Sequence, residues 1–424
     1  MSQPALARGL SPVRAVLDNG VVGIVQENPT APAVAINATF SAGSALEPES
    51  LPGLAYLTGL TIDRGARSRG PEAIAEALDD RGVALRVVVT RHTFTLVCTC
   101  LSEDFTDILS LLSEITRCPA FPEVELEKRR AEAITAVRQD LDSTSVRATE
   151  GVLELLYGKN HPYARPAKGT LDTLEAMRRA DLVEFHTRHL VPAALRVVIV
   201  GDVQRSHALD AVATRFTGWH GPDPEAEIVP PPPPRSRQAR AITMPGKSQA
   251  DIAYGFTAIR RLDPRYYAYW VMNNVLGQFG LGGRLAENIR EEQGMAYYAF
   301  SSFDGTVGEG PLLIRAGVDP VNVTRALAAI DSEVEKLHRE GPTVEEVEES
   351  RESLIGSIPR MLETNEGIAE FLQNAEQFGL GPDYDRRLPG LLRDVRFDDV
   401  RQAAREVLDT ERAAYAVAGP DIGP

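Results

Sequence analysis

The sequence predicts an α+β protein built of two duplicated lobes, each a mainly antiparallel sheet covered by helices. Three observations lead to this prediction. Runs of alternating apolar residues are separated by turn signals, which is typical of antiparallel strands with one covered face. Longer segments carry apolar residues at three- and four-residue spacing, as amphipathic helices do. These signals then recur in the same order in the second half of the chain.

The chain is long enough for two such lobes, with 424 residues of which 43% are hydrophobic. The clearest internal boundary is the proline run within "GPDPEAEIVPPPPPRSRQ". Consecutive prolines hold an extended backbone and cannot join a helix or a central strand. We therefore expect an N-terminal lobe over residues 1–220, a linker over 221–240 and a C-terminal lobe over 241–424.

In the first half, the strand-like "AVAINATFSAG" (33–43) is followed by helices and then by two strands within "GVALRVVVTRHTFTLVCTCLS" (82–102). The helical segments "DFTDILSLLSEI" (104–115) and "VELEKRRAEAITAVRQDL" (124–141) come next. Ile108, Leu111, Leu112 and Ile115 share one face of the first of these helices, so they should face a sheet. The half ends in the strand of "HLVPAALRVVIVGDV" (189–203).

The second half repeats this order. The strand-like "QADIAYGFTAI" (249–259) is followed by helices and by the strands of "MAYYAFSSFDGTVGEGPLLIRAGV" (295–318). Helical patterns fill 322–341 and 343–358, and "LDTERAAYAVAGP" (408–420) supplies the last strand. Two such lobes facing each other across the linker would enclose a cleft.

The composition of the chain argues against some classes of ligand and of cellular location. Asp and Glu outnumber Lys and Arg by 60 to 45, and the resulting net charge of -15 disfavours nucleic acid as a ligand. Of the three cysteines, Cys98 and Cys100 alternate within a strand, and Cys118 stands apart. We therefore expect the cysteines to be buried as small hydrophobic residues, in a reduced compartment.

The sequence has no signal-peptide core and no apolar run of about 18 residues. We expect a soluble, cytoplasmic protein, although processing of the amino terminus would hide an export signal.

The histidines form no familiar catalytic or metal-binding pattern. His186 and His189 are three residues apart but have no Cys or carboxylate at a zinc-ligand spacing, which favours a polar helix end. His161 lies in the turn-rich "YGKNHPYARP", where loop packing is expected. His92 alternates with apolar neighbours and should be a solvent-side strand residue. A Gly-x-Ser-x-Gly elbow and a phosphate-binding loop are also missing from the sequence.

A glycine-rich segment, "LGQFGLGGRLAENIREEQGMAYYAF" (276–300), is more informative. Its glycines free the backbone before a helix that should start near Arg284, and Gly294 should end that helix before a strand beginning near Met295. The glycines before the helix are Gly277, Gly280, Gly282 and Gly283.

Arg290 and Tyr297 lie seven residues apart across this helix-to-strand turn, so both side chains can reach one pocket. A guanidinium and a phenol are both hydrogen-bond donors suited to a carbonyl oxygen that gains negative charge. The alternative stays open at this point: Arg290 pairs with a surface carboxylate and Tyr297 packs in the sheet.

Another segment, "GLAYLTGLTIDRG" (53–65), has the turn signals of a helix. No residue between Gly53 and Ile62 ionises near neutral pH or readily holds a metal. Together with "FSAGS", "RGVALRVVVTRHTF", "CPAF", "GKNHPYARP" and "GGRLAENIREEQGMAYY", this segment carries a resemblance that covers nearly the whole chain. The order and spacing of these segments resemble the pitrilysin/insulinase family of inverted-motif zinc peptidases, which includes mitochondrial processing peptidase. The resemblance implies the metalloprotease (LuxS/MPP-like) fold.

The family's zinc site consists of His-x-x-Glu-His on a helix and a further Glu about 75 residues later. Aligned on this sequence, the two His positions are Tyr56 and Leu60, the catalytic base is Gly59, and the distal Glu is Ala136. The resemblance therefore implies a degenerate site with no metal in this chain, and we expect no peptidase activity from the chain alone.

The family also uses an Arg and a Tyr seven residues apart to bind the substrate carbonyl, and Arg290 and Tyr297 match that pair. In bacterial heterodimers of this family one subunit carries zinc and the other supplies the pair. The resemblance thus implies a non-catalytic subunit that contributes Arg290 and Tyr297 to a zinc-bearing partner, with peptides as substrates. Gly280, Gly282 and Gly283 would contact substrate.

Other readings of the same resemblance remain. A structural subunit, like the core proteins of respiratory complexes, would keep the fold without needing Arg290 and Tyr297. A peptide-presenting subunit would use its glycine-rich loop, but "LGQFGLGG" is shorter and less glycine-dense than the loop expected there. A homodimer and a heterodimer are both compatible with the sequence.

Overall fold

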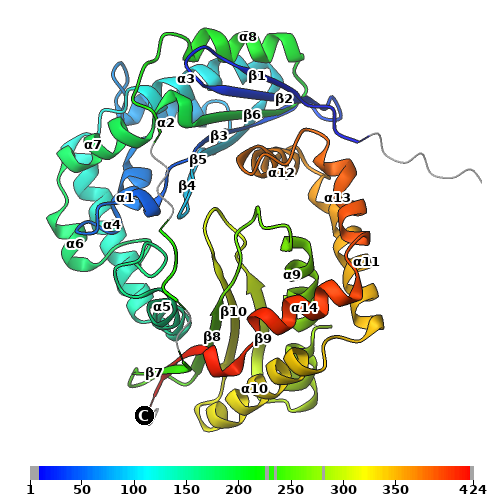
Figure 1. The fold of residues 1–424 in the computed structure, drawn as a ribbon. Helices are drawn as coiled ribbons and strands as arrows, with labels where there is room; N and C mark the ends of the chain where they lie inside the picture. The colour runs from blue at the N-terminus through cyan, green and yellow to red at the C-terminus, as the bar shows by residue number, and fades with distance from the viewer. Residues whose placement is uncertain (1–8, 225–228, 234–235, 279–281, 421–424) are drawn as a thin grey trace, which may run out of the picture. The chain divides into compact units, whose positions relative to one another are not determined.

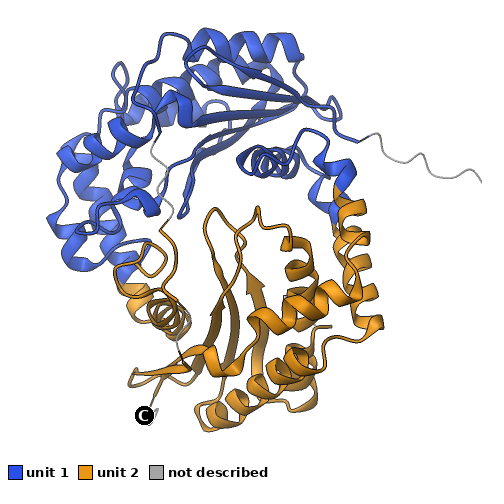
Figure 2. Cartoon of the chain, in the orientation of Figure 1, with its two compact units in different colours: residues 1–137, 166–227, 358–387 blue, residues 138–165, 228–357, 388–424 orange. Residues whose placement is uncertain are grey.

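The computed structural model describes residues 9–224, 229–233, 236–278 and 282–420 (Figure 1). They form two compact units (Figure 2). Unit 1 consists of residues 1–137, 166–227 and 358–387, and unit 2 of residues 138–165, 228–357 and 388–424.

Unit 1 contains a mainly antiparallel sheet in the strand order β1-β2-β6-β3-β5-β4, within which only the β2–β6 pair is parallel among the described strands. One face carries the larger core, where Phe40, Phe94 and Leu96 are fully buried. Ile108, Leu111, Leu112 and Ile115 of α3 are buried in this core, as their spacing predicts. The strands are β1 (Val13–Val16), β2 (Val22–Glu27), β3 (Ala33–Phe40), β4 (Arg86–Val89), β5 (Phe94–Leu101) and β6 (Leu195–Gly201).

Unit 2 contains a second sheet in the order β7-β11-β8-β10-β9, in which β7 and β11 are parallel and the other pairs antiparallel. Its strands are β7 (Gln238–Thr243), β8 (Ala250–Thr257), β9 (Ala296–Phe303), β10 (Pro311–Val318) and β11 (Ala414–Gly419). If the strands of each half are lettered a to e from β2 and from β7, both sheets have the order a-e-b-d-c with a parallel a–e pair. The predicted class, a duplicated α+β unit with mainly antiparallel sheets covered by helices, is confirmed.

Helices are the other main regular elements of the chain. Those of unit 1 are α1 (Leu54–Thr61), α2 (Pro71–Asp79), α3 (Phe105–Arg117), α6 (Leu171–Ala176), α7 (Arg179–His189), α8 (Arg205–Phe216) and α12 (Asn365–Gln377). Those of unit 2 are α5 (Thr144–Tyr157), α9 (Tyr266–Asn273), α10 (Val323–Arg339) and α14 (Phe397–Val407). The boundary between the units falls within α4 (Glu123–Leu141), α11 (Val344–Met361) and α13 (Tyr384–Arg393).

Each unit receives one helix from the other half of the sequence. In unit 1, Ile368, Ala369 and Leu372 of α12 pack with Ala35 of β3 and Val198 of β6, on the face opposite the larger core. A capping bond from Gly367 N–H to the hydroxyl of Thr364 starts this helix.

In unit 2, α5 lies on β11 and β8 with Ala148 and Val152 in the core. A Cβ at Gly151 would lie 2.9 Å from the Cβ of Ala416 and 3.0 Å from Cδ1 of Ile242, so the missing side chain lets α5 approach the strands closely. Close approach of this kind buries helix and sheet backbone without a gap.

The compact units therefore divide the chain differently from the sequence halves 1–220 and 241–424, because α5 and α12 join the unit of the opposite half. The periodicity of an amphipathic helix shows that it covers an apolar surface but not which one. Part of the segment 221–240 lies outside the described residues, and β7 already begins at Gln238. No helix among the described residues is both long and apolar enough to cross a bilayer.

The packing of α12 leads to a first prediction. Leu372 is 4% exposed, so Leu372→Ala should lower the free energy of unfolding of unit 1 by about 2–5 kcal/mol through lost burial and a cavity. Amide hydrogen exchange should speed up in β3 and β6 while β8 and β10 keep their protection. Leu262→Ala, at a side chain that is 59% exposed, serves as the control. Faster exchange in β8 and β10 instead would contradict the assignment of α12 to unit 1.

Candidate functional site

The helix α1 carries three of the four positions, Tyr56, Gly59 and Leu60, at which the resemblance would place zinc-site residues. It begins after Gly53, whose φ of 94° is left-handed and whose Cβ would lie 2.6 Å from the carbonyl oxygen of Lys168. The carboxylate of Glu47 is buried and accepts hydrogen bonds from the N–H groups of Gly53, at 3.0 Å, and Ala55, at 2.8 Å. These bonds satisfy free backbone donors at the positive end of the helix, so they hold the start of α1 firmly.

Apolar side chains pack around Tyr56, Gly59 and Leu60 of α1. Tyr56 and Leu60 are half-buried and pack against the core of unit 1. Gly59 is buried, and a Cβ there would lie 2.7 Å from Cγ2 of Val89 and 3.4 Å from Cγ1 of Val87, both on β4. Because a real Cβ does not tolerate 2.7 Å, position 59 cannot take a larger side chain without displacing the side chain of Val89.

The residues present do not fit zinc. Ala136 is half-buried on α4, and a methyl group there offers no ligand atom. Tyr56, Gly59 and Leu60 supply neither imidazole nor carboxylate nor thiolate, which are the groups that bind zinc in proteins. Across the described part of the chain, no group of three or more His, Cys, Asp or Glu side chains is placed to hold a metal ion.

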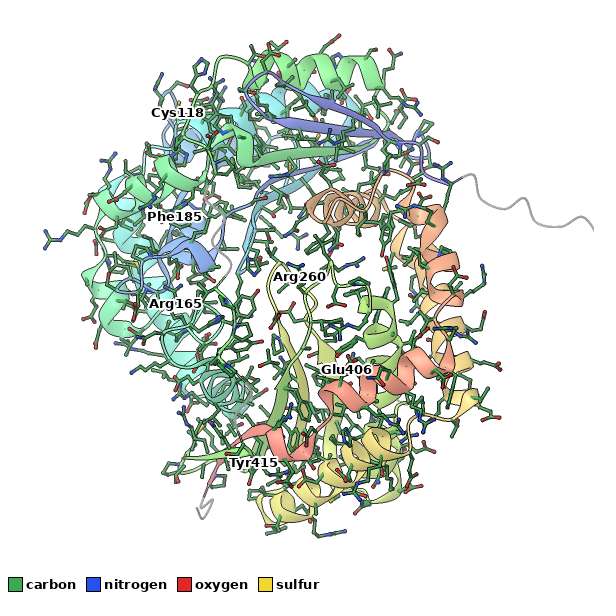
Figure 3. All side chains as sticks on the ribbon, in the orientation of Figure 1. Cys118, Arg165, Phe185, Arg260, Glu406 and Tyr415 are labelled. Atoms are coloured by element: carbon green, nitrogen blue, oxygen red, sulfur yellow. The ribbon has the colours of Figure 1, made fainter. Side chains whose placement is uncertain are left out.

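The histidines serve packing. His186 Nε2 lies 2.7 Å from the carbonyl oxygen of Thr116, and burial lowers the pKa of His186 below its usual value. His189 is buried, with its ring 4.9 Å from that of Phe185, which Figure 3 labels on α7. His161 is also buried and accepts a 3.1 Å hydrogen bond from the N–H of Tyr163. These contacts agree with the predicted helix-end and loop-packing roles.

The cysteines are also structural. Cys98 and Cys100 are free thiols buried on one face of β5 in the core, as predicted. Burial raises the pKa of Cys98 strongly and that of Cys100 to about 12, so both stay protonated and unreactive at neutral pH. Cys118 is a half-buried free thiol at the end of α3 (Figure 3).

The second group of predicted residues lies on the helix-to-strand connection of unit 2. The helix begins at Arg284, continues as a π-helical segment over Ala286–Glu292, and ends before Gly294, whose φ is 60°. Arg284 anchors its start through two hydrogen bonds to Glu346 of α11, at 2.6 and 2.7 Å. The predicted helix start and the glycine stop are confirmed, and β9 begins at Ala296, one residue after the predicted Met295.

Arg290 and Tyr297 are both exposed on this connection. The side chain of Arg290 is 43% exposed and forms an ion pair of 3.6 Å with Glu291, its neighbour in sequence. An exposed pair with this geometry contributes little to stability. Tyr297 is the second residue of β9 and is 71% exposed. Of the two alternatives that the sequence left open, a surface pairing of Arg290 is present, whereas packing of Tyr297 in the sheet is not.

One extra residue interrupts the regular structure on each side of the turn. In the π-helical segment, the N–H of Gln293 bonds to the carbonyl of Asn288 five residues earlier. In β9, Tyr298 lies opposite Gly317 and Ala296 lies opposite Val318, so Tyr297 is the extra residue of a β-bulge. Such insertions cost regular hydrogen bonding and recur at functional sites, where they redirect a side chain.

The glycine-rich segment has a structural role at its base. A Cβ at Gly283 would lie 2.6 Å from Cα of Gly277, so these two glycines meet backbone to backbone. Gly283 is therefore buried, Gly282 is exposed, and Gly280 lies outside the described residues. A role of these glycines in substrate binding stays a prediction.

Sequence reasoning missed two residues that shape these sites. Nothing in the pattern around Glu47 indicates that it caps α1, because no serine, threonine or asparagine cap precedes that helix. Val89 belongs to a predicted strand, but the alternation of "RVVV" does not indicate that its methyl group fills the space beside Gly59. His92, expected within a strand, lies in the turn between β4 and β5, where it is half-buried.

A second prediction tests whether the side chain of Val89 closes the space beside Gly59 on α1. Gly59→Ala should lower the free energy of unfolding by about 1–3 kcal/mol, because its methyl group collides with Val89. In a Val89→Ala background the same change should be neutral or stabilising by up to about 1 kcal/mol, because alanine favours a helix over glycine. Chemical denaturation of the four variants measures this coupling. Gly356→Ala on α11, where nothing lies within 4 Å of the new methyl group, is the matched control. Equal effects of Gly59→Ala in both backgrounds would show that Val89 does not close the site.

A third prediction concerns His92. Burial, assisted by the charge of Arg91, lowers the pKa of His92 to about 4. Since the unfolded chain binds this proton below about pH 6.5, stability should fall as pH drops from about 6.5 to about 4, by at most about 1.4 kcal/mol per pH unit. His92→Asn should flatten this part of the profile, as measured by urea unfolding between about pH 4 and pH 7. An NMR titration of His92 with a midpoint near the usual value would contradict the assignment.

Comparison with known proteins supports the relationship. Residues 22–170 match the family model described as insulinase (peptidase family M16), and residues 176–354 match the model of the peptidase M16 inactive domain. A Bacillus subtilis (strain 168) protein named uncharacterized zinc protease YmxG is 24% identical over 96% of this chain and 98% of its own length. A Helicobacter pylori (strain ATCC 700392 / 26695) protein named non-peptidase homolog YmxG is 23% identical over 93% of this chain and 90% of its own length.

Solved structures share the fold. The crystal structure of a peptidase M16 inactive domain from Pseudomonas fluorescens has a TM-score of 0.91 and 23% identity, with 98% of this chain and 99% of that chain covered. That of a protease from Helicobacter pylori has a TM-score of 0.89 and 17% identity, with 97% and 100% covered. With both family models matched in sequence order and the His-x-x-Glu-His motif missing from the sequence, the chain belongs to the insulinase (M16) family of peptidases as an inactive homologue.

Proposed function

We propose that this chain is the non-catalytic subunit of a two-subunit zinc peptidase, to which it contributes Arg290 and Tyr297 as ligands of the substrate carbonyl. The observation that carries the proposal is the exposure of Tyr297 at a β-bulge, opposite a π-helical segment that carries Arg290. An aromatic side chain that is 71% exposed forgoes most of the stabilisation of burial. The π-helical segment and the β-bulge are two irregularities on one short connection. Irregular backbone of this kind lowers stability, so its presence supports a functional role for the connection.

The chemistry of the pair suits an acceptor that becomes more negative. A guanidinium offers several N–H donors and no acceptor, and a phenol donates one O–H. Both bonds strengthen when the carbonyl oxygen of a scissile peptide gains charge, so they favour the transition state over the ground state. The weak ion pair between Arg290 and Glu291 is easily exchanged for such a ligand.

The partner would have to supply the hydrolytic site. In this chain Tyr56, Gly59, Leu60 and Ala136 provide neither metal ligands nor a base, and Val89 fills the space beside Gly59. The Bacillus subtilis relative is named a zinc protease, and we propose zinc-dependent peptide hydrolysis for the complex. In this complex the partner binds the zinc ion and this chain is metal-free. Unfolded or small peptides are the expected substrates, and the cytoplasm is the expected compartment.

A fourth prediction follows for the assembled complex. Tyr297→Phe and Arg290→Ala should each lower kcat by ~10²–10³, because one transition-state donor is lost, while assembly is unchanged. The chain would be combined with the family member of the same organism that carries His-x-x-Glu-His. Hydrolysis of a pool of quenched fluorescent peptides gives the rate, and sedimentation gives the assembly.

Two variants control for non-specific effects. Arg339→Ala removes an exposed arginine at the end of α10, and Tyr415→Phe removes a half-buried phenol of β11, and neither should change kcat. The chain alone should show no hydrolysis. Full activity of both Tyr297→Phe and Arg290→Ala in an intact complex would remove the proposed role.

That last outcome would favour the second candidate, a structural or peptide-binding scaffold without a proteolytic role. The relative named non-peptidase homolog is the observation in its favour. A scaffold would still assemble with its partner, but its contribution would not depend on the donors of Arg290 and Tyr297.

A further inference from the structure

The residue after Tyr297 reaches with its side chain across the neighbouring strand β10 to β8. Tyr298 lies directly opposite Gly317 of β10, and its hydroxyl donates a hydrogen bond to Oδ1 of Asp251 on β8. The ring passes over Gly317 because no side chain is there. A Cβ at Gly317 would lie 2.5 Å from Cε1 of Tyr298 and 2.7 Å from Nε2 of Gln249.

Asp251 is a fixed acceptor for this bond. Its side chain is 2% exposed, and its carboxylate also accepts hydrogen bonds from the hydroxyl of Thr144 on α5 and from Nε2 of Gln249, at 3.1 Å to each oxygen. A buried carboxylate with several donors holds each of them strongly. Burial and the bond to Asp251 raise the pKa of Tyr298 to about 12, so the phenol remains a donor at neutral pH.

Within the described part of the sheet, the strand that this bond holds is paired on one side only. Among the described strands, β9 is at the edge of its sheet and pairs only with β10. Its pairing with β10 is interrupted by a bulge, and a shift of the register by one residue would move every side chain to the opposite face. Residues 297 and 298 are both tyrosines, so side-chain identity alone does not determine which of them is exposed.

We propose that Tyr298, Gly317 and Asp251 form a register clamp that fixes the bulge in β9 and thereby positions Tyr297 for substrate. The inference rests on the proposed function of Tyr297 and assigns Tyr298, Asp251 and Gly317 as positioning residues. Gly317 admits the ring, Asp251 holds the hydroxyl, and the bulge then leaves Tyr297 as the residue directed into solvent.

The first test uses the chain alone, without a partner. Tyr298→Phe should accelerate amide hydrogen exchange of residues 296–298 by about tenfold or more, because the strand loses a bond to a charged acceptor. Tyr254→Phe is the matched control, because Tyr254 of β8 also donates to a carboxylate, that of Asp331, at 2.9 Å. This control should lower the melting temperature without changing exchange at 296–298.

A second pair of variants keeps the test valid if Tyr298→Phe folds poorly. Gly317→Ala should accelerate the same exchange in the natural sequence, because its methyl group displaces the ring. In a Tyr298→Ala background, where no ring is displaced, Gly317→Ala should have no such effect. Unchanged exchange in both Tyr298→Phe and Gly317→Ala would overturn the clamp.

The positioning role is then tested in the assembled complex, where Tyr298→Phe should lower kcat by about tenfold with little change in KM, and Tyr254→Phe should change neither. If Tyr297→Phe abolishes turnover but Tyr298→Phe leaves kcat unchanged, the positioning role is wrong. If Tyr297→Phe itself is fully active, the proposed function fails, while the exchange experiments still decide whether the clamp exists.

Discussion

Each sheet of this protein has two apolar faces, and the need to cover both determines the arrangement of the chain. In each unit one face is covered by helices close in sequence, and the other receives a helix from the opposite half. The contact of α5 with β11 depends on Gly151 and Ala416, which are small enough for helix and strand to touch. In unit 2 this contact also places Thr144 beside Asp251, so the same helix that completes the core supports the acceptor that holds Tyr298.

The two candidate sites on this scaffold differ in how their residues are packed. On α1, Glu47 caps the start of the helix and a methyl group of Val89 occupies the space beside Gly59. On the connection to β9, Tyr297 is exposed on an edge strand whose pairing is interrupted by a bulge. Apolar packing stabilises the residues on α1, whereas an exposed aromatic side chain at a bulge gains little from burial.

Much of the fold was accessible from the sequence because local periodicity reports burial directly. The alternation in residues 33–43 and the spacing of Ile108, Leu111, Leu112 and Ile115 placed a strand and a helix correctly. The destination of α5 and α12 was not accessible, because the periodicity of an amphipathic helix does not show which sheet it covers. The bulge at Tyr297 and the contact of Gly59 with Val89 depend on register and on side-chain reach across strands, which no single segment encodes.

The placement of α12 also has a consequence for how the protein is made. Asn37 of β3 donates a hydrogen bond to Gln373 of α12 across 336 residues of sequence. The first sheet therefore emerges from the ribosome long before the helix that covers its second face. Until then that face stays open, and closure must await nearly complete synthesis, which is the kind of long-range pairing that slows folding and exposes nascent chains to aggregation. A translational pause or a truncation before residue 365 would leave the amino-terminal sheet dependent on chaperones.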